Sequence, residues 1–258
     1  MKSKRLFLAA FLLCTAAFAG DTTSAAHKIK IVLVGDSTVN DGGGWGSGFK
    51  RFLTGDVECI NVAMNGRSTM SFMKEGRWTN ALALKGDYYF IQFGHNNEPG
   101  KPGRSTDMPT FVSDMNKYVD DTRAIGAKPV LVTPLSRRQW EKGSTNKINS
   151  SLAPYAEAVR KIAAEKTVPL IELHDRSKAL CESLGKEKCY EFSPVKVVDG
   201  TNTFDGTHLT GPGHVLFARI VVEELRTAVP ELAAYLLAEP KAAEAKETPA
   251  TATKSVAQ

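Results

Sequence analysis

Three polar side chains in this sequence have the types that together make a serine hydroxyl reactive. Ser37 follows an apolar run at residues 29–34, and Asp205 and His208 stand three residues apart, shortly before the last helical pattern. A serine hydroxyl is a poor nucleophile until a base takes its proton, and an imidazole is a better base when a carboxylate fixes its tautomer. We therefore expect Ser37 to be a nucleophile, His208 its base and Asp205 the orienting carboxylate.

An acyl-transfer site also needs hydrogen-bond donors for the negative charge that develops on the carbonyl oxygen. Two further clusters of small and polar residues, at 65–68 and 94–97, each follow an apolar run. They contain Gly66 and Asn96. The predicted donors are the backbone N–H groups of Ser37 and Gly66 and the side-chain amide of Asn96.

Alternating strand-like and helix-like segments must bring these residues together. Short apolar runs rich in β-branched and aromatic residues predict strands at 29–34, 57–62, 88–93, 129–132 and 168–173. Helical spacing predicts helices at 49–53, 108–125 and 152–166 and after Thr210, with a long loop at about 185–206. This alternation is typical of an α/β fold, with helices on both faces of a parallel sheet. The carboxyl ends of parallel strands meet at one edge, where ligands bind, so the clusters are expected to converge there.

Five short motifs occur in order along the chain: GDST at 35–38, GWG at 44–46, NGRS at 65–68, GHNN at 94–97 and DGTH at 205–208. In these motifs the sequence resembles the SGNH (GDSL-like) hydrolases, and within them the rhamnogalacturonan acetylesterases. The resemblance spans about residues 29–222. It implies a three-layer, flavodoxin-like α/β/α fold with about five parallel strands. It also implies that Ser37 is the nucleophile, Gly66 and Asn96 are oxyanion donors, His208 is the base and Asp205 its partner.

The third motif departs from the family, which usually has an acid where this chain has Asn97. That position is not the oxyanion donor, so we expect the change to affect local hydrogen bonding and not catalysis. The resemblance implies an esterase that needs no cofactor and removes acetyl groups from a polysaccharide, as in pectin. Other acetylated glycans and short-chain lipid or thioester substrates stay open at this point.

Candidate substrate contacts are two tryptophans, Trp45 and Trp140, and the paired Arg137 and Arg138. The segment at 133–140 follows the fourth predicted strand, so it leaves the sheet at the edge where Ser37 lies. Arginine suits paired hydrogen bonding to a carboxylate, and the galacturonate of a pectic backbone carries one. The alternatives are an exposed basic loop that merely solvates the domain and tryptophans that are buried in the core.

The termini differ from the rest in composition. Residues 1–19 have cations, an apolar run and a small-residue cleavage site, typical of a secretory signal peptide. The expected domain is 27–238, and the Ala-, Lys- and Glu-rich residues 239–258 predict a disordered tail. The signal holds three of the 33 cations, leaving 30 against 28 acids, which does not favour nucleic-acid binding. We expect a secreted or periplasmic monomer without stable membrane insertion.

The cysteines and the ligand-type residues leave other options to weigh. Cys181 and Cys189 could form a local disulfide in an oxidising compartment, whereas Cys59 lies in an apolar run and is expected to be a small buried hydrophobe. No cluster has the spacing of a metal site. A metal-dependent phosphoesterase would begin with Asp-x-His, which is absent before Gly35. A non-catalytic carbohydrate-binding protein would not need a complete set of catalytic residues.

Overall fold

The computed structural model describes residues 28–242. Its centre is a five-stranded parallel sheet in the order β2-β1-β3-β4-β5, which is the flavodoxin-like order. The first strand lies inside the sheet, between the second and the third, where its apolar residues 31–34 are covered on both faces. The strands are β1 (Ile29–Gly35), β2 (Val57–Asn61), β3 (Tyr88–Gln92), β4 (Lys128–Val132) and β5 (Leu170–Ile171).

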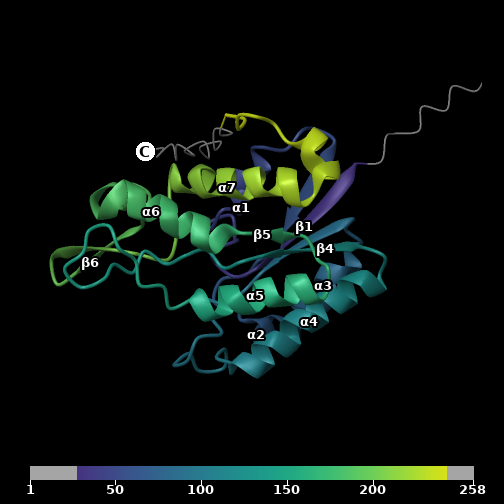
Figure 1. Ribbon diagram of the computed structural model, residues 1–258, viewed down its shortest axis with the longest axis horizontal. Helices are drawn as coiled ribbons and strands as arrows, with labels where there is room; N and C mark the ends of the chain where they lie inside the picture. Colours follow the sequence, from purple (N-terminus) through teal and green to yellow (C-terminus); the bar gives the residue numbers. More distant parts are fainter. Residues whose placement is uncertain (1–27, 243–258) are drawn as a thin grey trace, which may run out of the picture.

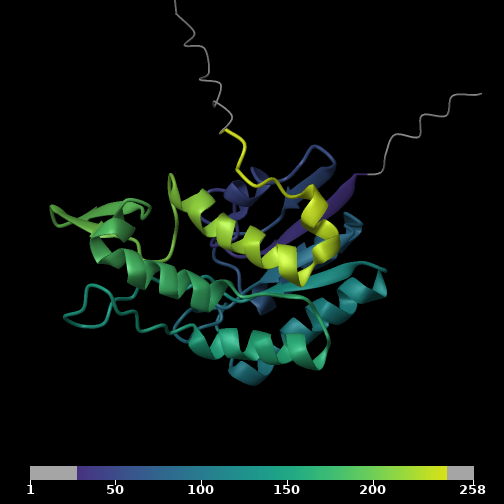
Figure 2. The same cartoon turned by 45° about the horizontal axis from the view of Figure 1, so that its top comes forward.

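Helices cover both faces of this sheet, so the predicted three-layer α/β/α fold is confirmed (Figure 1). One layer is formed by α1 (Gly46–Lys50), α6 (Leu173–Tyr190) and α7 (Gly213–Ala228). The other is formed by α2 (Thr69–Lys74), α3 (Arg77–Ala83), α4 (Met108–Ala124) and α5 (Ala153–Glu165). A short 3-10 helix, η1 (Pro230–Tyr235), follows α7, and Figure 2 shows the two helical layers from a second side.

Two hydrophobic cores result, one on each face. Successive strand residues point to opposite faces, so Ile31 and Leu33 pack with α1, α6 and α7, whereas Val32 and Val34 pack with α2 to α5. All four are buried. This two-sided burial explains why residues 31–34 of the strand are all apolar, without alternation.

The region at 185–206, which we expected to be a loop, is largely regular structure. Helix α6 continues through a kink at Gly185 to Tyr190, and an antiparallel hairpin follows, made of β6 (Val195–Val198) and β7 (Thr201–Phe204). Asp199 and Gly200 have φ values of 49° and 72°, the left-handed pair that a two-residue hairpin turn requires. The loop prediction was therefore wrong, although the Asp-Gly signal was present in the sequence.

Other boundaries shift by smaller amounts. The fifth strand is two residues long instead of the six predicted, and the first helix begins at Gly46 instead of Phe49. The domain continues past the predicted boundary at 238, because Glu239 pairs with Arg219 and Lys241 exchanges hydrogen bonds with Arg51. The predicted signal peptide and the rest of the predicted tail lie outside the described residues. Within 28–242, no helix combines the length and the apolar character needed to cross a bilayer.

Candidate active site

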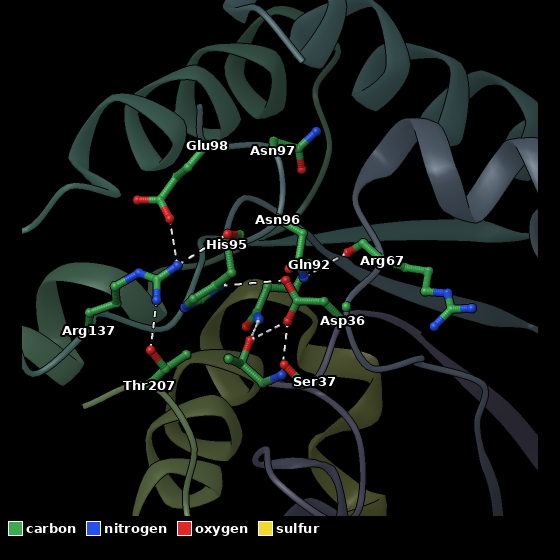
Figure 3. A network of polar contacts seen from close by, with 12 residues as sticks. Asp36, Ser37, Arg67, Gln92, His95, Asn96, Asn97, Glu98, Arg137 and Thr207 are labelled. Carbon is green, nitrogen blue, oxygen red and sulfur yellow. Dashed lines mark hydrogen bonds and ion pairs between the residues drawn. The ribbon is translucent and has the colours of Figure 1, made fainter. Parts of the chain in front are cut away.

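The turn after β1 places Ser37 at the carboxyl edge of the sheet. Gly35 is required there, because a Cβ at this position would lie 2.5 Å from the Gln92 carbonyl oxygen of β3. Asp36 then folds back, and its Oδ1 accepts hydrogen bonds from the backbone N–H and the hydroxyl of Thr38, at 2.9 and 2.7 Å. The buried carboxylate thus orders the turn and leaves the hydroxyl of Ser37 at its outer side (Figure 3).

A chain of buried hydrogen bonds anchors this turn to the core. The indole N–H of Trp45 donates to Gln92 Oε1 at 2.9 Å, and Gln92 Nε2 donates to the Thr38 hydroxyl at 2.7 Å. Trp45 is completely buried, so our prediction that it contacts substrate is wrong. Its function is to close the hydrogen-bond chain that ends at Asp36, since a buried indole N–H needs an acceptor.

The structure brings Ser37, His208 and Asp205 together. The Nε2 atom of His208 lies 2.8 Å from Ser37 Oγ, and its Nδ1 atom lies 2.8 Å from Asp205 Oδ2. His208 reaches the serine from the segment just before α7, 171 positions along the chain. This is the geometry in which an imidazole can take a proton from a hydroxyl while a carboxylate holds its tautomer.

Asp205 is held as an anion by its local hydrogen bonds. Burial raises the pKa of its carboxyl, but hydrogen bonds from the His208 ring and from the backbone N–H groups of His208 and Thr207 outweigh this and lower it to about 2. A permanent negative charge beside Nδ1 favours the protonated imidazole that forms when His208 accepts the serine proton.

The two predicted oxyanion donors lie on the loops beside this turn. Gly66 has φ +75°, a conformation that side chains rarely adopt, so a glycine suits this position. Asn96 Nδ2 donates to the Arg67 carbonyl oxygen at 3.1 Å, and Asn96 Oδ1 accepts from Arg104 Nη1 at 3.3 Å. These contacts fix which side of the amide carries the N–H groups, one of which stays available for a developing oxyanion.

The departure at Asn97 has a local explanation. Its side chain is fully buried and donates to the hydroxyls of Thr69 and Thr106, at 2.7 and 2.9 Å. The Thr69 hydroxyl in turn donates to Asp114 at 2.6 Å, so it can only accept from Asn97. An amide supplies the two donors that this arrangement needs.

His95 and Arg137 continue the polar network beyond Asp36 (Figure 3). His95 is buried, its Nδ1 lies 3.6 Å from Asp36 Oδ2, and burial lowers its pKa. The guanidinium of Arg137 is bound by Glu98 at 2.5 Å, by the Thr207 hydroxyl at 2.7 Å and by the His95 carbonyl oxygen. Arg137 was predicted to bind a substrate carboxylate. In this structure its guanidinium is paired with the Glu98 carboxylate, and the contact with a substrate carboxylate stays a prediction.

The prediction that Arg138 contacts substrate is wrong, because its side chain is buried. This residue is 5% exposed, and its Nη2 donates to the carbonyl oxygens of Asp205 and His208 at 3.0 and 2.5 Å. Its Nε donates to the Ser193 hydroxyl, and its backbone N–H donates to the Gly206 carbonyl oxygen. Arg138 therefore clamps the 205–208 segment from inside, and its Nη1 atom is buried without a hydrogen-bond partner among the described residues.

Trp140 stays a candidate substrate contact. It is half-buried against the core and lines a cavity of about 180 Å³ together with Arg138, Tyr190 and Phe204. Gly206 also lines this cavity, which places it next to the segment that carries Asp205 and His208. A larger cavity of about 660 Å³ lies at the opposite edge of the sheet, lined by Ile29 and other strand-start residues, and does not belong to the site.

A second serine–histidine–aspartate contact occurs at the end of β5. His174 bridges Ser150 Oγ and Asp175 Oδ1, at 2.7 Å each, and is buried. Glu172, His174 and Asp175 also lie close enough to hold a metal ion, but the guanidinium of Arg160 binds both carboxylates, at 2.6 and 2.8 Å. The arginine thus satisfies these anions, and the cluster ties α5 to the start of α6.

The described cysteines are free thiols. Cys181 and Cys189 are buried neighbours, and Cys189 Sγ contacts the Cys181 carbonyl oxygen at 3.7 Å, so the disulfide considered above is not formed in this structure. Cys59 is half-buried, and burial raises the pKa of its thiol to about 12. A thiol with that pKa stays protonated near neutral pH and is not a nucleophile.

Comparison with known proteins agrees with this geometry. A model of the GDSL-like lipase/acylhydrolase family matches residues 33–216, which include Ser37, Gly66, Asn96, Asp205 and His208. The chain belongs to this family. Members of the GDSL-like family hydrolyse esters, so the predicted enzyme class, a carboxylic ester hydrolase, is confirmed.

Named relatives of this GDSL-like protein are similar over most of its length. It is 35% identical over 212 residues to the rhamnogalacturonan acetylesterase RhgT of Bacillus subtilis (strain 168), covering 76% of this chain and 88% of that one. It is 34% identical over 206 residues to the probable rhamnogalacturonan acetylesterase YesY of the same organism, covering 76% and 92%. The resemblance inferred from the motifs is thereby confirmed.

A solved structure shares the fold. An acetylxylan esterase from Geobacillus stearothermophilus superposes with a TM-score of 0.58 at 16% identity, covering 78% of this chain and 96% of that one. At this identity the likeness concerns the fold. It agrees with the three-layer architecture and the order of the parallel strands described above.

Proposed function

We propose that this protein is a secreted serine esterase that removes acetyl groups from a plant-type polysaccharide, acetylated rhamnogalacturonan in pectin. The observation that carries the proposal is the continuous chain from Ser37 through His208 to Asp205, with both contacts at 2.8 Å. The similarity to two rhamnogalacturonan acetylesterases supports the choice of substrate.

The reaction follows from the placement of the groups. Ser37 Oγ attacks the acetyl carbonyl carbon while His208 Nε2 takes the hydroxyl proton, and Asp205 stabilises the resulting imidazolium. The Ser37 and Gly66 N–H groups and the Asn96 amide donate to the oxyanion. His208 then returns the proton to the sugar oxygen, which leaves with the polysaccharide. A water molecule, deprotonated by the same imidazole, attacks the acetyl-serine and releases acetate.

Acetate release from a panel of polysaccharides tests the substrate. Acetylated rhamnogalacturonan, homogalacturonan, xylan and mannan would be incubated with the wild-type protein and with Ser37→Ala, and acetate would be quantified enzymatically. The proposal expects the fastest release from rhamnogalacturonan and none above background with the variant. Faster release from xylan or mannan would keep the esterase mechanism and overturn the pectic substrate.

Secretion is the part of the proposal that rests on the sequence of residues 1–19. Mass spectrometry of the protein purified from the culture medium or the periplasm would show its first residue. Cleavage near Ala19 is expected, and a chain that retains its initiator methionine and stays in the cytoplasm would overturn secretion.

A further inference from the structure

Most cations around the active site are already paired with acids. Arg137 and Lys101 both bind Glu98, at 2.5 and 2.9 Å. Arg67 and Arg77 both bind Glu75, at 3.0 and 2.6 Å. Each of these two carboxylates binds two cations, so none of the four cations is without an acidic partner.

Arg104 differs from these cations. Among residues 28–242, no carboxylate lies within ion-pair distance of its guanidinium, which is half-buried. Its Nη1 makes two long contacts, to Asn96 Oδ1 at 3.3 Å and to the Gly66 carbonyl oxygen at 3.4 Å. Within the described chain no hydrogen bond engages its Nε or Nη2. These two atoms form one edge of the guanidinium, the edge that can bind a carboxylate through two parallel hydrogen bonds.

The backbone around Arg104 is held firmly. Its N–H donates to the Lys101 carbonyl oxygen at 3.0 Å, and the Ser105 hydroxyl donates to the Glu98 carbonyl oxygen at 2.7 Å. Thr106 N–H donates to the Asn97 carbonyl oxygen at 3.0 Å, which joins this loop to the oxyanion segment. A guanidinium on a fixed loop loses little freedom when it binds a ligand.

We propose that Arg104 binds the carboxylate of a uronic acid residue in the substrate, next to the acetyl ester that Ser37 attacks. Through Nη1 it contacts both residues assigned as oxyanion donors, Gly66 and Asn96. A pyranose ring whose acetylated hydroxyl points to Ser37 therefore brings its own or a neighbouring carboxylate to the open Nε–Nη2 edge. This inference rests on the proposed function and names Arg104 as the residue that recognises the acidic sugar. From the sequence, Arg137 and Arg138 were the residues predicted to do so.

The test compares two substrates that differ in charge alone. Acetylated rhamnogalacturonan oligosaccharides would be used with free carboxylates and as methyl esters, and kcat/KM for acetate release would be measured on both. The variant Arg104→Gln removes the charge and keeps a side-chain amide for Asn96, whereas Arg104→Lys keeps the charge and loses the paired geometry. Arg77→Gln removes one cation from the same region without touching Gly66 or Asn96 and is the matched control.

The wild-type protein should prefer the free acid. Arg104→Gln should lower kcat/KM on the free acid about 10- to 100-fold, the value of a charge-assisted contact, with a much smaller effect on the methyl ester. The preference of Arg104→Lys for the free acid should lie between that of the wild-type protein and that of Arg104→Gln. Arg77→Gln should keep the wild-type ratio of kcat/KM on the free acid to kcat/KM on the methyl ester.

Two results would overturn the inference alone. One is an equal loss on both substrates in Arg104→Gln, which would mean that Arg104 merely orients Asn96. The other is no loss on either substrate in Arg104→Gln, which would mean that Arg104 does not contact the substrate. If the wild-type protein hydrolyses aryl acetates but releases no acetate from either oligosaccharide, the pectic substrate itself is refuted and the inference falls with it.

Discussion

The clamp formed by Arg138 makes the positioning of the catalytic histidine sensitive to a residue that never touches substrate. The perturbation is Arg138→Met, which keeps the length and apolar stem of the side chain and removes its guanidinium. Three hydrogen bonds from a charged donor disappear, to the carbonyl oxygens of Asp205 and His208 and to the Ser193 hydroxyl.

The size of the effect follows from two opposing contributions. Each hydrogen bond to a charged group contributes about 1.5–3 kcal/mol, and the two carbonyl oxygens would be left without this donor. Removing a buried guanidinium also relieves a desolvation cost of several kcal/mol, so we expect the free energy of unfolding to fall by about 2–4 kcal/mol. A shift of His208 by about 1 Å relative to Ser37 would lower kcat by roughly 10²-fold, with a smaller change in KM.

The assay is hydrolysis of an aryl acetate together with urea unfolding of the same preparations. Arg123→Met is the matched control, because Arg123 also donates to two backbone carbonyl oxygens, those of Lys166 and Thr167, but at the end of α4 away from Ser37. A folded Arg138→Met protein with wild-type kcat, or the same kcat loss in Arg123→Met, would refute the clamp.

Three further predictions concern the donors, the buried amide and the pH dependence. Asn96→Ala should lower kcat about 10²- to 10³-fold and change KM much less, because the oxyanion forms in the transition state; steady-state kinetics would contradict this if KM alone rose. Asn97→Asp should lower the midpoint of thermal unfolding, because two donors to the hydroxyls of Thr69 and Thr106 are lost and a charge is buried; an unchanged midpoint would oppose this reading. Because the pKa of Asp205 is held at about 2, Asp205 stays ionised at higher pH. The fall of log(kcat/KM) from about pH 7 to pH 4 should then have a slope of one, for a single base; a slope of two would require a second protonated group.

The layer architecture could be predicted from the sequence because its elements have strong local patterns. The run at 31–34 is apolar throughout because both of its faces are covered, and α4 has regular helical spacing that ends at Gly126. The hairpin at 195–204 was not predicted, although the pair Asp199-Gly200 is typical of a two-residue hairpin turn. Four of its residues are exposed hydrophobics, Val195, Val197, Val198 and Phe204, so no alternation of buried and exposed positions marked the strands.

The nucleophile, base and carboxylate could be proposed because each has a residue type that the chemistry requires. The surrounding arginines and tryptophans could not be assigned in this way. A position after a strand shows which edge of the sheet a residue occupies. It does not show which hydrogen-bond acceptors lie within reach of the side chain. Arg138 finds two of them 67 and 70 positions away, and Trp45 finds its acceptor on β3. Arg104 gave no signal, because the role proposed for it depends on the lack of an acidic partner among residues 28–242, which the sequence does not show.

The central claim is that Ser37 is the nucleophile, and the turnover of Ser37→Ala on an aryl acetate tests it most directly. The variant should fold as the wild-type protein does, since its hydroxyl contacts His208 alone among the described residues, and its kcat should fall by several orders of magnitude. Circular dichroism and urea unfolding would establish that the fold is intact. A folded Ser37→Ala protein that hydrolyses the aryl acetate at a rate near that of the wild type would contradict the account.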